Sequence, residues 1–222
     1  MNEEIIQKIL EEKIIIIVRG LEGEPLMQLA EALYEGGIRF MEITYAADKE
    51  ETDEAVAQTI RTLSERMDGR MYIGAGTVIR KNQVDLTKAA GGKFIISPDA
   101  DPEIIAHTKQ CGLVSIPGAL TPGEITAAHR AGADFVKLFP ANLHGPSYVK
   151  TIKAPLSHIR LLAVGSVDET TMEAYAEAGA CGFGIGTKFG DPNLLKNRDF
   201  AAITEVAKGY VAIAKSKNGA KA

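Results

Sequence analysis

Short apolar runs alternate along the chain with longer segments in which apolar positions recur at helical spacing. Eight such runs, rich in β-branched residues, lie at residues 14–20, 40–45, 71–78, 94–98, 113–118, 135–141, 160–167 and 182–187. Strands separated by helices pair in parallel, and parallel sheets are covered on both faces. Such burial explains why the first run begins with the unbroken aliphatic sequence IIIIV. The pattern therefore predicts eight strand–helix units.

Capping residues and glycines mark the limits of the intervening helices. Helix starts are indicated by Asp101-Pro102, Thr121-Pro122 and Asp168. Helix ends are indicated by glycines that supply a left-handed turn into the next strand, at Gly36-Gly37, Gly91-Gly92, Gly112, Gly132 and Gly179. These signals support the division into strand–helix units.

Eight units in 222 residues predict the α/β class and a closed (β/α)8 TIM barrel that forms a single domain over residues 1–222. An open doubly wound sheet is the alternative, although it usually needs fewer strands for this length. Residues 2–12 predict an extra N-terminal helix that plugs the N-terminal end of the barrel. The segment 199–215 is predicted to be the last outer helix.

Composition narrows the class of protein. The chain has 25 Lys and Arg against 29 Asp and Glu, a net charge of −4, which argues against a nucleic-acid surface. Its longest aliphatic run, residues 14–18, is far too short for a membrane helix, and its acidic start does not resemble a signal peptide. Cys111 and Cys181 form no CxxC pair and predict two buried reduced thiols. We therefore expect a cytoplasmic protein that binds neither nucleic acid nor membrane.

Candidate chemistry is sought where strands end, because (β/α)8 enzymes carry their active sites at the C-terminal face of the barrel. Polar residues embedded in or following the apolar runs at this face are Arg19, Glu42, Thr44, Thr77, Ser97, Lys137, Ser166 and Thr187. Strand alternation places Glu42 and Thr44 on one face, and Lys137 on one face with two phenylalanines. If both faces point inward, a carboxylate and an amine converge in one apolar chamber.

Lys137 is the sharpest signal, because lysine is almost never buried without cause. Burial favours the neutral amine, which is the nucleophile needed to condense with a ketone. The alternative is a buried ion pair with Glu42, but such pairs are costly relative to apolar replacements, so the catalytic interpretation is favoured. Glu42 could instead face outward in a salt bridge, yet its parity with Thr44 favours an inward general base.

The remaining candidates suggest an anionic substrate. Arg19 could clamp a carboxylate or merely cap a strand end, and Thr77 could be an ordinary strand residue, so both interpretations stay open. Gly165-Ser166 and the run Gly184 to Thr187 lie where barrels build phosphate sites from backbone N–H groups. The four histidines, His107, His129, His144 and His158, contain no pair with metal-ligand spacing, so no metal site is predicted.

Together these residues resemble the class I 2-keto-3-deoxy-6-phosphogluconate/4-hydroxy-2-oxoglutarate (KDPG/KHG) aldolases. The resemblance covers roughly residues 5–215. The motifs that carry it occur in order as IVRG (17–20), MEIT (41–44), GAGTV (74–78), ISP (96–98), IPG (116–118), VKLFPA (136–141), GS (165–166) and GIGT (184–187).

The resemblance implies a homotrimer of (β/α)8 barrels that needs no cofactor and cleaves 2-keto-4-hydroxy acids to pyruvate and an aldehyde. It implies that Lys137 forms a Schiff base and that Glu42 moves protons through a water. The substrate-binding residues it implies are Arg19 and Thr77 at the pyruvate carboxylate, Phe139 beneath the substrate, Gly165, Ser166, Gly186 and Thr187 at the phosphate, and Thr44 and Pro98.

Three positions depart from the family pattern. Many members have Arg where this chain has Ala46, so a second carboxylate contact is expected to be missing. The usual Thr-Gly-Gly reads Val164-Gly165-Ser166, which removes a hydroxyl and crowds a backbone approach. The usual Ser of the last loop is Thr187, which keeps the hydroxyl.

The predicted function is cleavage of 2-keto-3-deoxy-6-phosphogluconate (KDPG) to pyruvate and glyceraldehyde 3-phosphate. By the same resemblance, 4-hydroxy-2-oxoglutarate would give pyruvate and glyoxylate. The alternatives are a 2-keto-3-deoxy-6-phosphogalactonate (KDPGal) aldolase, a phosphosugar isomerase or epimerase, and a catalytically silent barrel that binds a phosphorylated acid.

Overall fold

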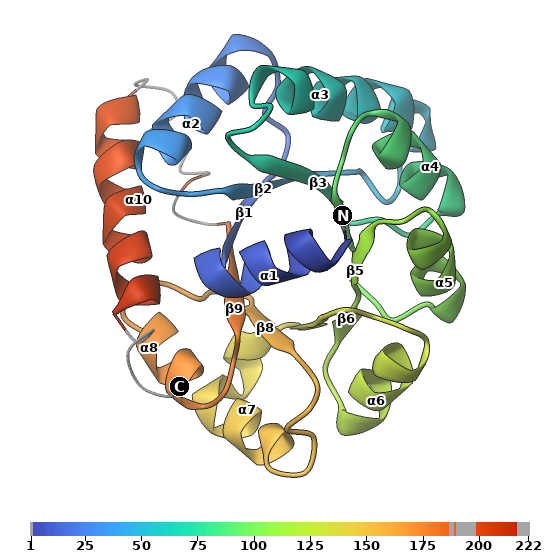
Figure 1. Ribbon diagram of the computed structural model, residues 1–222, viewed down its shortest axis with the longest axis vertical. Coiled ribbons are helices and arrows are strands. Elements are labelled where there is room, and N and C mark those ends of the chain that lie inside the picture. Colours follow the sequence, from blue (N-terminus) through green and yellow to red (C-terminus); the bar gives the residue numbers. More distant parts are fainter. Residues whose placement is uncertain (1, 187–188, 190–198, 217–222) are drawn as a thin grey trace.

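Parallel strands form a closed ring that is surrounded by helices (Figure 1). The computed structural model describes residues 2–186, 189 and 199–216. Within these residues the strands are β1 (Ile14–Val18), β2 (Phe40–Thr44), β3 (Tyr72–Gly76), β4 (Phe94–Ile96), β5 (Val114–Ile116), β6 (Gly118–Ala119), β7 (Val136–Leu138), β8 (Leu161–Val164) and β9 (Gly182–Ile185). Every strand pair in the sheet is parallel. The predicted α/β barrel is confirmed.

The fifth predicted strand is divided in two at Pro117. Its first half, β5, pairs with β4, and its second half, β6, pairs with β7. The backbone N–H of Lys137 donates to the Pro117 carbonyl at 2.8 Å, so the pairing with β7 begins at the bend itself. The strand order β5-β4-β3-β2-β1-β9-β8-β7-β6 therefore closes through one proline.

The outer helices begin and end close to the predicted signals. They are α2 (Gly23–Glu35), α3 (Asp53–Arg66), α4 (Lys81–Ala89), α5 (Pro102–Gln110), α6 (Pro122–Arg130), α7 (Gly145–Lys153), α8 (Met172–Glu177) and α10 (Phe200–Lys215). Asp101 accepts from the Glu103 N–H at the start of α5, and Thr121 forms a capping box with Glu124 at the start of α6. Helix α10 coincides with the last outer helix that the sequence predicts over residues 199–215.

Helix α1 (Asn2–Glu12) closes the N-terminal end of the barrel, as predicted. Figure 1 shows it lying across the centre of the ring of strands. Its buried side chains Ile5, Ile6 and Ile9 join the cluster of residues that point into the barrel, which includes Phe40 and Phe94. A second, larger cluster fills the layer between the strands and the outer helices.

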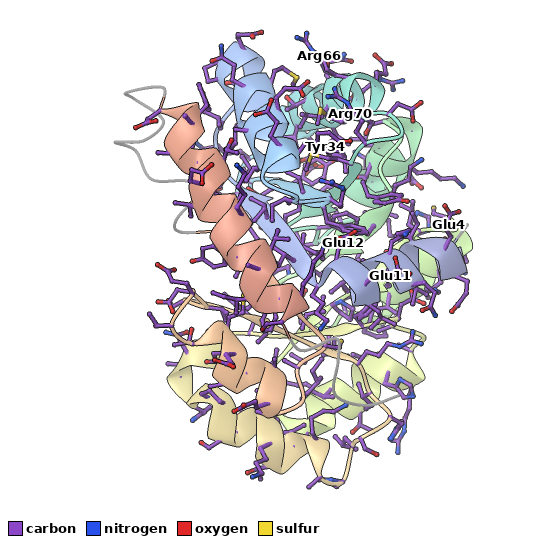
Figure 2. The ribbon with its side chains drawn as sticks, turned by 60° about the vertical axis from the view of Figure 1, so that its left-hand side comes forward. Glu4, Glu11, Glu12, Tyr34, Arg66 and Arg70 are labelled. Carbon is purple, nitrogen blue, oxygen red and sulfur yellow. The ribbon has the colours of Figure 1, made fainter. Side chains whose placement is uncertain are left out.

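Charged contacts tie the outer helices together away from the barrel mouth. Arg70, just after α3, donates to both carboxylate oxygens of Glu31 on α2, and its guanidinium lies 5.4 Å from the centroid of the Tyr34 ring. Figure 2 shows Arg70 beside Tyr34 on this side of the molecule, and acidic residues along α1. These contacts hold α2 against the end of α3.

The structure bears on two expectations from composition, the state of the cysteines and the absence of a membrane-spanning helix. Cys111 and Cys181 are both free thiols, as predicted, but each residue is only partly buried rather than buried. Cys111 caps the C-terminal end of α5, and Cys181 directly precedes β9. Among the described residues, no helix is both long enough and apolar enough to span a membrane.

Candidate active site

Lys137 lies in the middle of the short strand β7, and its side chain is 8% exposed. Its Nζ is 4.6 Å from the centroid of the Phe139 ring, two residues further along the chain. Burial lowers the pKa of Lys137, Arg19 lowers it further, and the charge of Glu42 opposes both effects. The apolar strand predicted from the sequence thus holds an amine that loses its proton more readily than a surface lysine.

Glu42, at the centre of β2, is 2% exposed. Burial raises its pKa to about 7, although Lys137 and Arg19 both favour the ionised form. Its Oε2 atom is buried without a hydrogen-bond partner, so this oxygen is not engaged by the Lys137 amine. The structure therefore does not support the alternative of a closed, purely structural ion pair.

Gly76, which is not among the residues predicted for the site, fixes the position of the Glu42 carboxyl group. Gly76 pairs with Thr44 at the end of β3, and a Cβ at Gly76 would overlap Oε1 of Glu42. The signal was present in the sequence, since a glycine within a strand often marks a close approach of another group. Any larger residue at position 76 would displace the carboxyl group.

Arg19 and Thr77 meet at the mouth of the barrel. Arg19 directly follows β1, Thr77 directly follows β3, and Nη2 of Arg19 donates to Oγ1 of Thr77 at 3.4 Å. The φ angle of Thr77 is +57°, in the left-handed region that β-branched residues rarely adopt. Strained backbone of this kind persists where the surrounding structure imposes it, and it concentrates at functional sites.

The loop after β8 forms another part of the mouth. Gly165 has a φ of +115° and Ser166 a φ of +50°, so two consecutive residues leave the ordinary right-handed region. Successive backbone N–H groups in such turns form concave sites that suit anions. Gly186, just after β9, lies at the same rim. Thr187, also predicted for this rim, lies outside the described residues.

One cavity of about 180 Å³ unites most of the predicted site. It is lined by Ile17, Arg19, Glu42, Thr77, Lys137, Phe139, Val164, Gly165, Ser166, Val167, Gly184 and Gly186. Gly184 belongs to the glycine-rich run predicted for a phosphate site, whereas Ile17 and Val167 are apolar residues that the sequence does not single out. The amine, the carboxyl group and the glycine-rich loops therefore share one chamber.

Two predicted substrate contacts lie outside this cavity. Thr44 is buried with its Oγ1 unpartnered, and it lines a neighbouring space of about 650 Å³ that also contains Arg19, Thr77 and Ala46. Pro98 is exposed beyond the end of β4, and its carbonyl lies against Gly118. Neither residue lines the smaller cavity, so contact of Thr44 or Pro98 with the substrate stays a prediction.

Comparison with known proteins finds related aldolases. The family described as KDPG and KHG aldolase matches residues 5–206. A probable 2-dehydro-3-deoxy-6-phosphogalactonate aldolase of Rhizobium meliloti is 34% identical over 83% of this chain and 85% of its own length. The 2-dehydro-3-deoxy-6-phosphogalactonate aldolase of Escherichia coli K12 is 31% identical over 78% of this chain and 82% of its own length.

Solved structures share the fold. The KDPG aldolase of Legionella pneumophila, with pyruvate captured as a covalent carbinolamine intermediate, superposes with a TM-score of 0.78 at 26% identity, covering 89% of this chain and 93% of that one. A carbinolamine is the adduct of an amine with a ketone, the chemistry for which a buried lysine is suited. The chain therefore belongs to the KDPG and KHG aldolase family, whose members are class I aldolases of the carbon–carbon lyase class.

Proposed function

We propose that this aldolase cleaves the C3–C4 bond of 2-keto-3-deoxy-6-phosphohexonates, releasing pyruvate and glyceraldehyde 3-phosphate through an imine on Lys137. The observation that carries the proposal is the shared cavity. It places a buried amine and an unpartnered buried carboxyl oxygen beside a rim of left-handed backbone. KDPG and its C4 epimer KDPGal are the substrates.

The reaction follows from the two ionisable side chains. The neutral Lys137 amine adds to the C2 ketone, and loss of water from the carbinolamine gives an iminium ion. Glu42 takes the proton of the C4 hydroxyl group, directly or through water, while the C3–C4 electron pair moves into the iminium. The aldehyde leaves, C3 of the enamine is protonated, and hydrolysis frees pyruvate and the lysine. The iminium is the electron sink throughout.

The carboxylate end and the phosphate end of the substrate would bind to different parts of the cavity. Arg19 and Thr77 are at the side of the cavity formed by β1 and β3, where the guanidinium would pair with the carboxylate. Gly165, Ser166 and Gly186 lie at the rim formed after β8 and β9 and would hold the phosphate through backbone N–H groups. The cavity of about 180 Å³ suits the pyruvate end, and the phosphate end would reach the rim.

Activity on KDPGal is supported by two findings. The relatives that are 34% and 31% identical carry names that specify phosphogalactonate. Val164 presents an apolar wall to the cavity at the position where the family pattern has a threonine hydroxyl. An apolar wall makes no hydrogen bond to the C4 hydroxyl group and so discriminates weakly between epimers that differ only in the direction of that group. Unphosphorylated 4-hydroxy-2-oxoglutarate would react more slowly, because it makes no use of the rim.

Borohydride reduction in the presence of pyruvate tests the imine directly. The three-carbon unit should become attached to the peptide that contains Lys137, and Lys137→Ala should lose both labelling and aldol cleavage. Lys150→Ala, which removes an exposed lysine of α7, is the matched control and should behave as wild type. Labelling at another lysine, or full activity of Lys137→Ala, would overturn the proposal.

The homotrimer and the cytoplasmic location remain predictions. The trimer rests on the family resemblance alone, and light scattering on the purified protein would measure its mass.

A further inference from the structure

A group of potential metal ligands lies on the outer surface, away from the cavity that contains Lys137. His107 and Cys111 are four residues apart at the C-terminal end of α5, so their side chains project from the same face of that helix. Asp85 reaches toward them from the neighbouring helix α4. None of the three lines the proposed active site.

The three donor atoms converge closely. Nε2 of His107 is 2.7 Å from Oδ1 of Asp85, the Cys111 thiol donates to the same oxygen at 3.5 Å, and Cys111 Sγ is 3.8 Å from Nε2. Ligands of a tetrahedral zinc ion, with bonds of about 2.0–2.3 Å, are separated from one another by about 3.3–3.7 Å. Only the contact between His107 and Asp85 must lengthen, by less than about 1 Å, to admit such an ion.

We propose that Asp85, His107 and Cys111 bind one divalent transition-metal ion of the zinc class and thereby clip α4 to α5. An imidazole nitrogen, a thiolate and a carboxylate form a borderline-soft set that suits Zn²⁺ or Co²⁺, whereas Mg²⁺ and Ca²⁺ prefer sites made of oxygen alone. A water molecule would complete the tetrahedron. On binding, the metal–sulfur bond replaces the S–H bond of Cys111, and the proton passes to the solvent.

The surroundings favour a cation at this place. The last carbonyl groups of α5 carry the negative end of the helix dipole, and Cys111 is the residue that caps them. The Asp85 side chain is 57% exposed and that of His107 23% exposed, so an ion reaches both without unfolding of the helices. Burial and the neighbouring Asp85 carboxylate raise the pKa of the Cys111 thiol, and Lys88 lowers it. A bound divalent cation would itself supply the positive charge that favours the thiolate.

Cobalt titration of metal-free protein tests the ligand set. Wild type should bind one Co²⁺ ion per chain, with the absorption of a thiolate–cobalt charge transfer, and Zn²⁺ but not Mg²⁺ should displace it. Cys111→Ser should abolish the charge-transfer band, and Asp85→Asn, at an exposed position that keeps the fold, should weaken binding by at least about tenfold. The matched controls Cys181→Ser and His129→Gln should leave the spectrum and the affinity unchanged.

Thermal unfolding tests the clip. Zn²⁺ should raise the melting temperature of wild type and of both control variants, because a ligand that binds only the folded state stabilises it, and it should not raise that of Cys111→Ser. A charge-transfer band that survives in Cys111→Ser, non-saturating binding, or the absence of a thermal shift at saturating Zn²⁺ would overturn the proposal. Borohydride trapping at Lys137 is unaffected by any of these outcomes, so the metal site and the aldolase mechanism are tested separately.

Discussion

Burial acts in opposite directions on the two ionisable side chains of the cavity. It is the largest influence on both: it lowers the pKa of Lys137 and raises that of Glu42, while their mutual attraction opposes each shift. Both groups thus move toward their uncharged forms, which the proposed mechanism uses at different steps. Side chains with pKa values drawn toward the working pH are the ones that exchange protons efficiently.

Replacement of Glu42 should change the pH dependence of catalysis as well as its rate. The base must be ionised, so wild-type kcat should rise with pH through about 7, the raised pKa of Glu42. Glu42→Gln should lower kcat by about 10²–10⁴-fold and remove this limb of the profile, while imine trapping at Lys137 persists. Steady-state kinetics across pH measures both effects, with the exposed Glu103→Gln as control. A loss below about tenfold would make Glu42 a structural residue.

Val164 should govern the choice between the C4 epimers. Wild type is expected to cleave KDPG and KDPGal with kcat/KM values within about two orders of magnitude, because an apolar wall discriminates weakly. Val164→Thr introduces a hydroxyl group in a side chain of similar size. It should shift the ratio of the two kcat/KM values. The two epimers are assayed side by side by pyruvate release. An unchanged ratio in Val164→Thr, with a strong wild-type preference, would show that this position does not set selectivity.

At the scale of elements, backbone strain concentrates at the ends of strands that border the cavity. Among the described residues, Thr77 after β3, Ser166 after β8 and Lys13 before β1 are the non-glycine residues with positive φ. The first two line the cavity, whereas Lys13 lies at the opposite end of its strand. Such conformations cost about 1–3 kcal/mol each, and the rigid strands on either side hold them in place.

The turn after β8 should matter for the phosphate end of the substrate alone. Gly165→Ala places a side chain at a φ of +115° and brings its Cβ to 3.2 Å from the Ala141 amide nitrogen, so the turn must shift. We expect kcat/KM for KDPG to fall by about tenfold or more, and that for 4-hydroxy-2-oxoglutarate to change little, because remote binding energy is lost only for the phosphorylated substrate. Equal losses for both substrates would indicate general damage to the site.

At the scale of the molecule, α1 contributes to the core of the barrel itself. Ile9 is 1% exposed among side chains that point into the barrel. Ile9→Ala should lower the free energy of unfolding by about 2–4 kcal/mol, since it removes buried methyl groups and leaves a cavity. Urea denaturation measures the change, and Glu4→Ala on the exposed side of α1 should alter it by less than about 0.5 kcal/mol. A small effect of Ile9→Ala would mean that α1 packs loosely.

The barrel and its chemistry could be predicted because their signals are local. Alternation of strand and helix patterns fixes the architecture, and a lysine within an apolar strand stands out by itself. The division at Pro117 could not be predicted, because both halves of that run have the same apolar character and differ only in their partners. Thr44 shares strand parity with Glu42, but it lies at the end of β2 and faces the neighbouring space.

The triad of Asp85, His107 and Cys111 was also beyond sequence patterns. Its members come from two helices, and only helix packing brings the aspartate to the other two. It contains a single histidine, so no pair of histidines in the sequence signals it. Pro98, which the ISP motif predicts to contact the substrate, lies exposed beyond the end of β4 at Ile96, and this contact stays a prediction.

The bend at Pro117 separates the residues of the candidate site into two half-barrels. Residues before it supply β1 to β5, with Arg19, Glu42 and Thr77, and residues after it supply β6 to β9, with Lys137, Gly165 and Ser166. The proposed nucleophile and phosphate rim therefore reside in one half, and the proposed proton-transfer group and carboxylate clamp in the other. If the protein were expressed as two polypeptides divided at this bend, neither half would hold a complete site. Pyruvate release would then be observed only when the two halves reassemble.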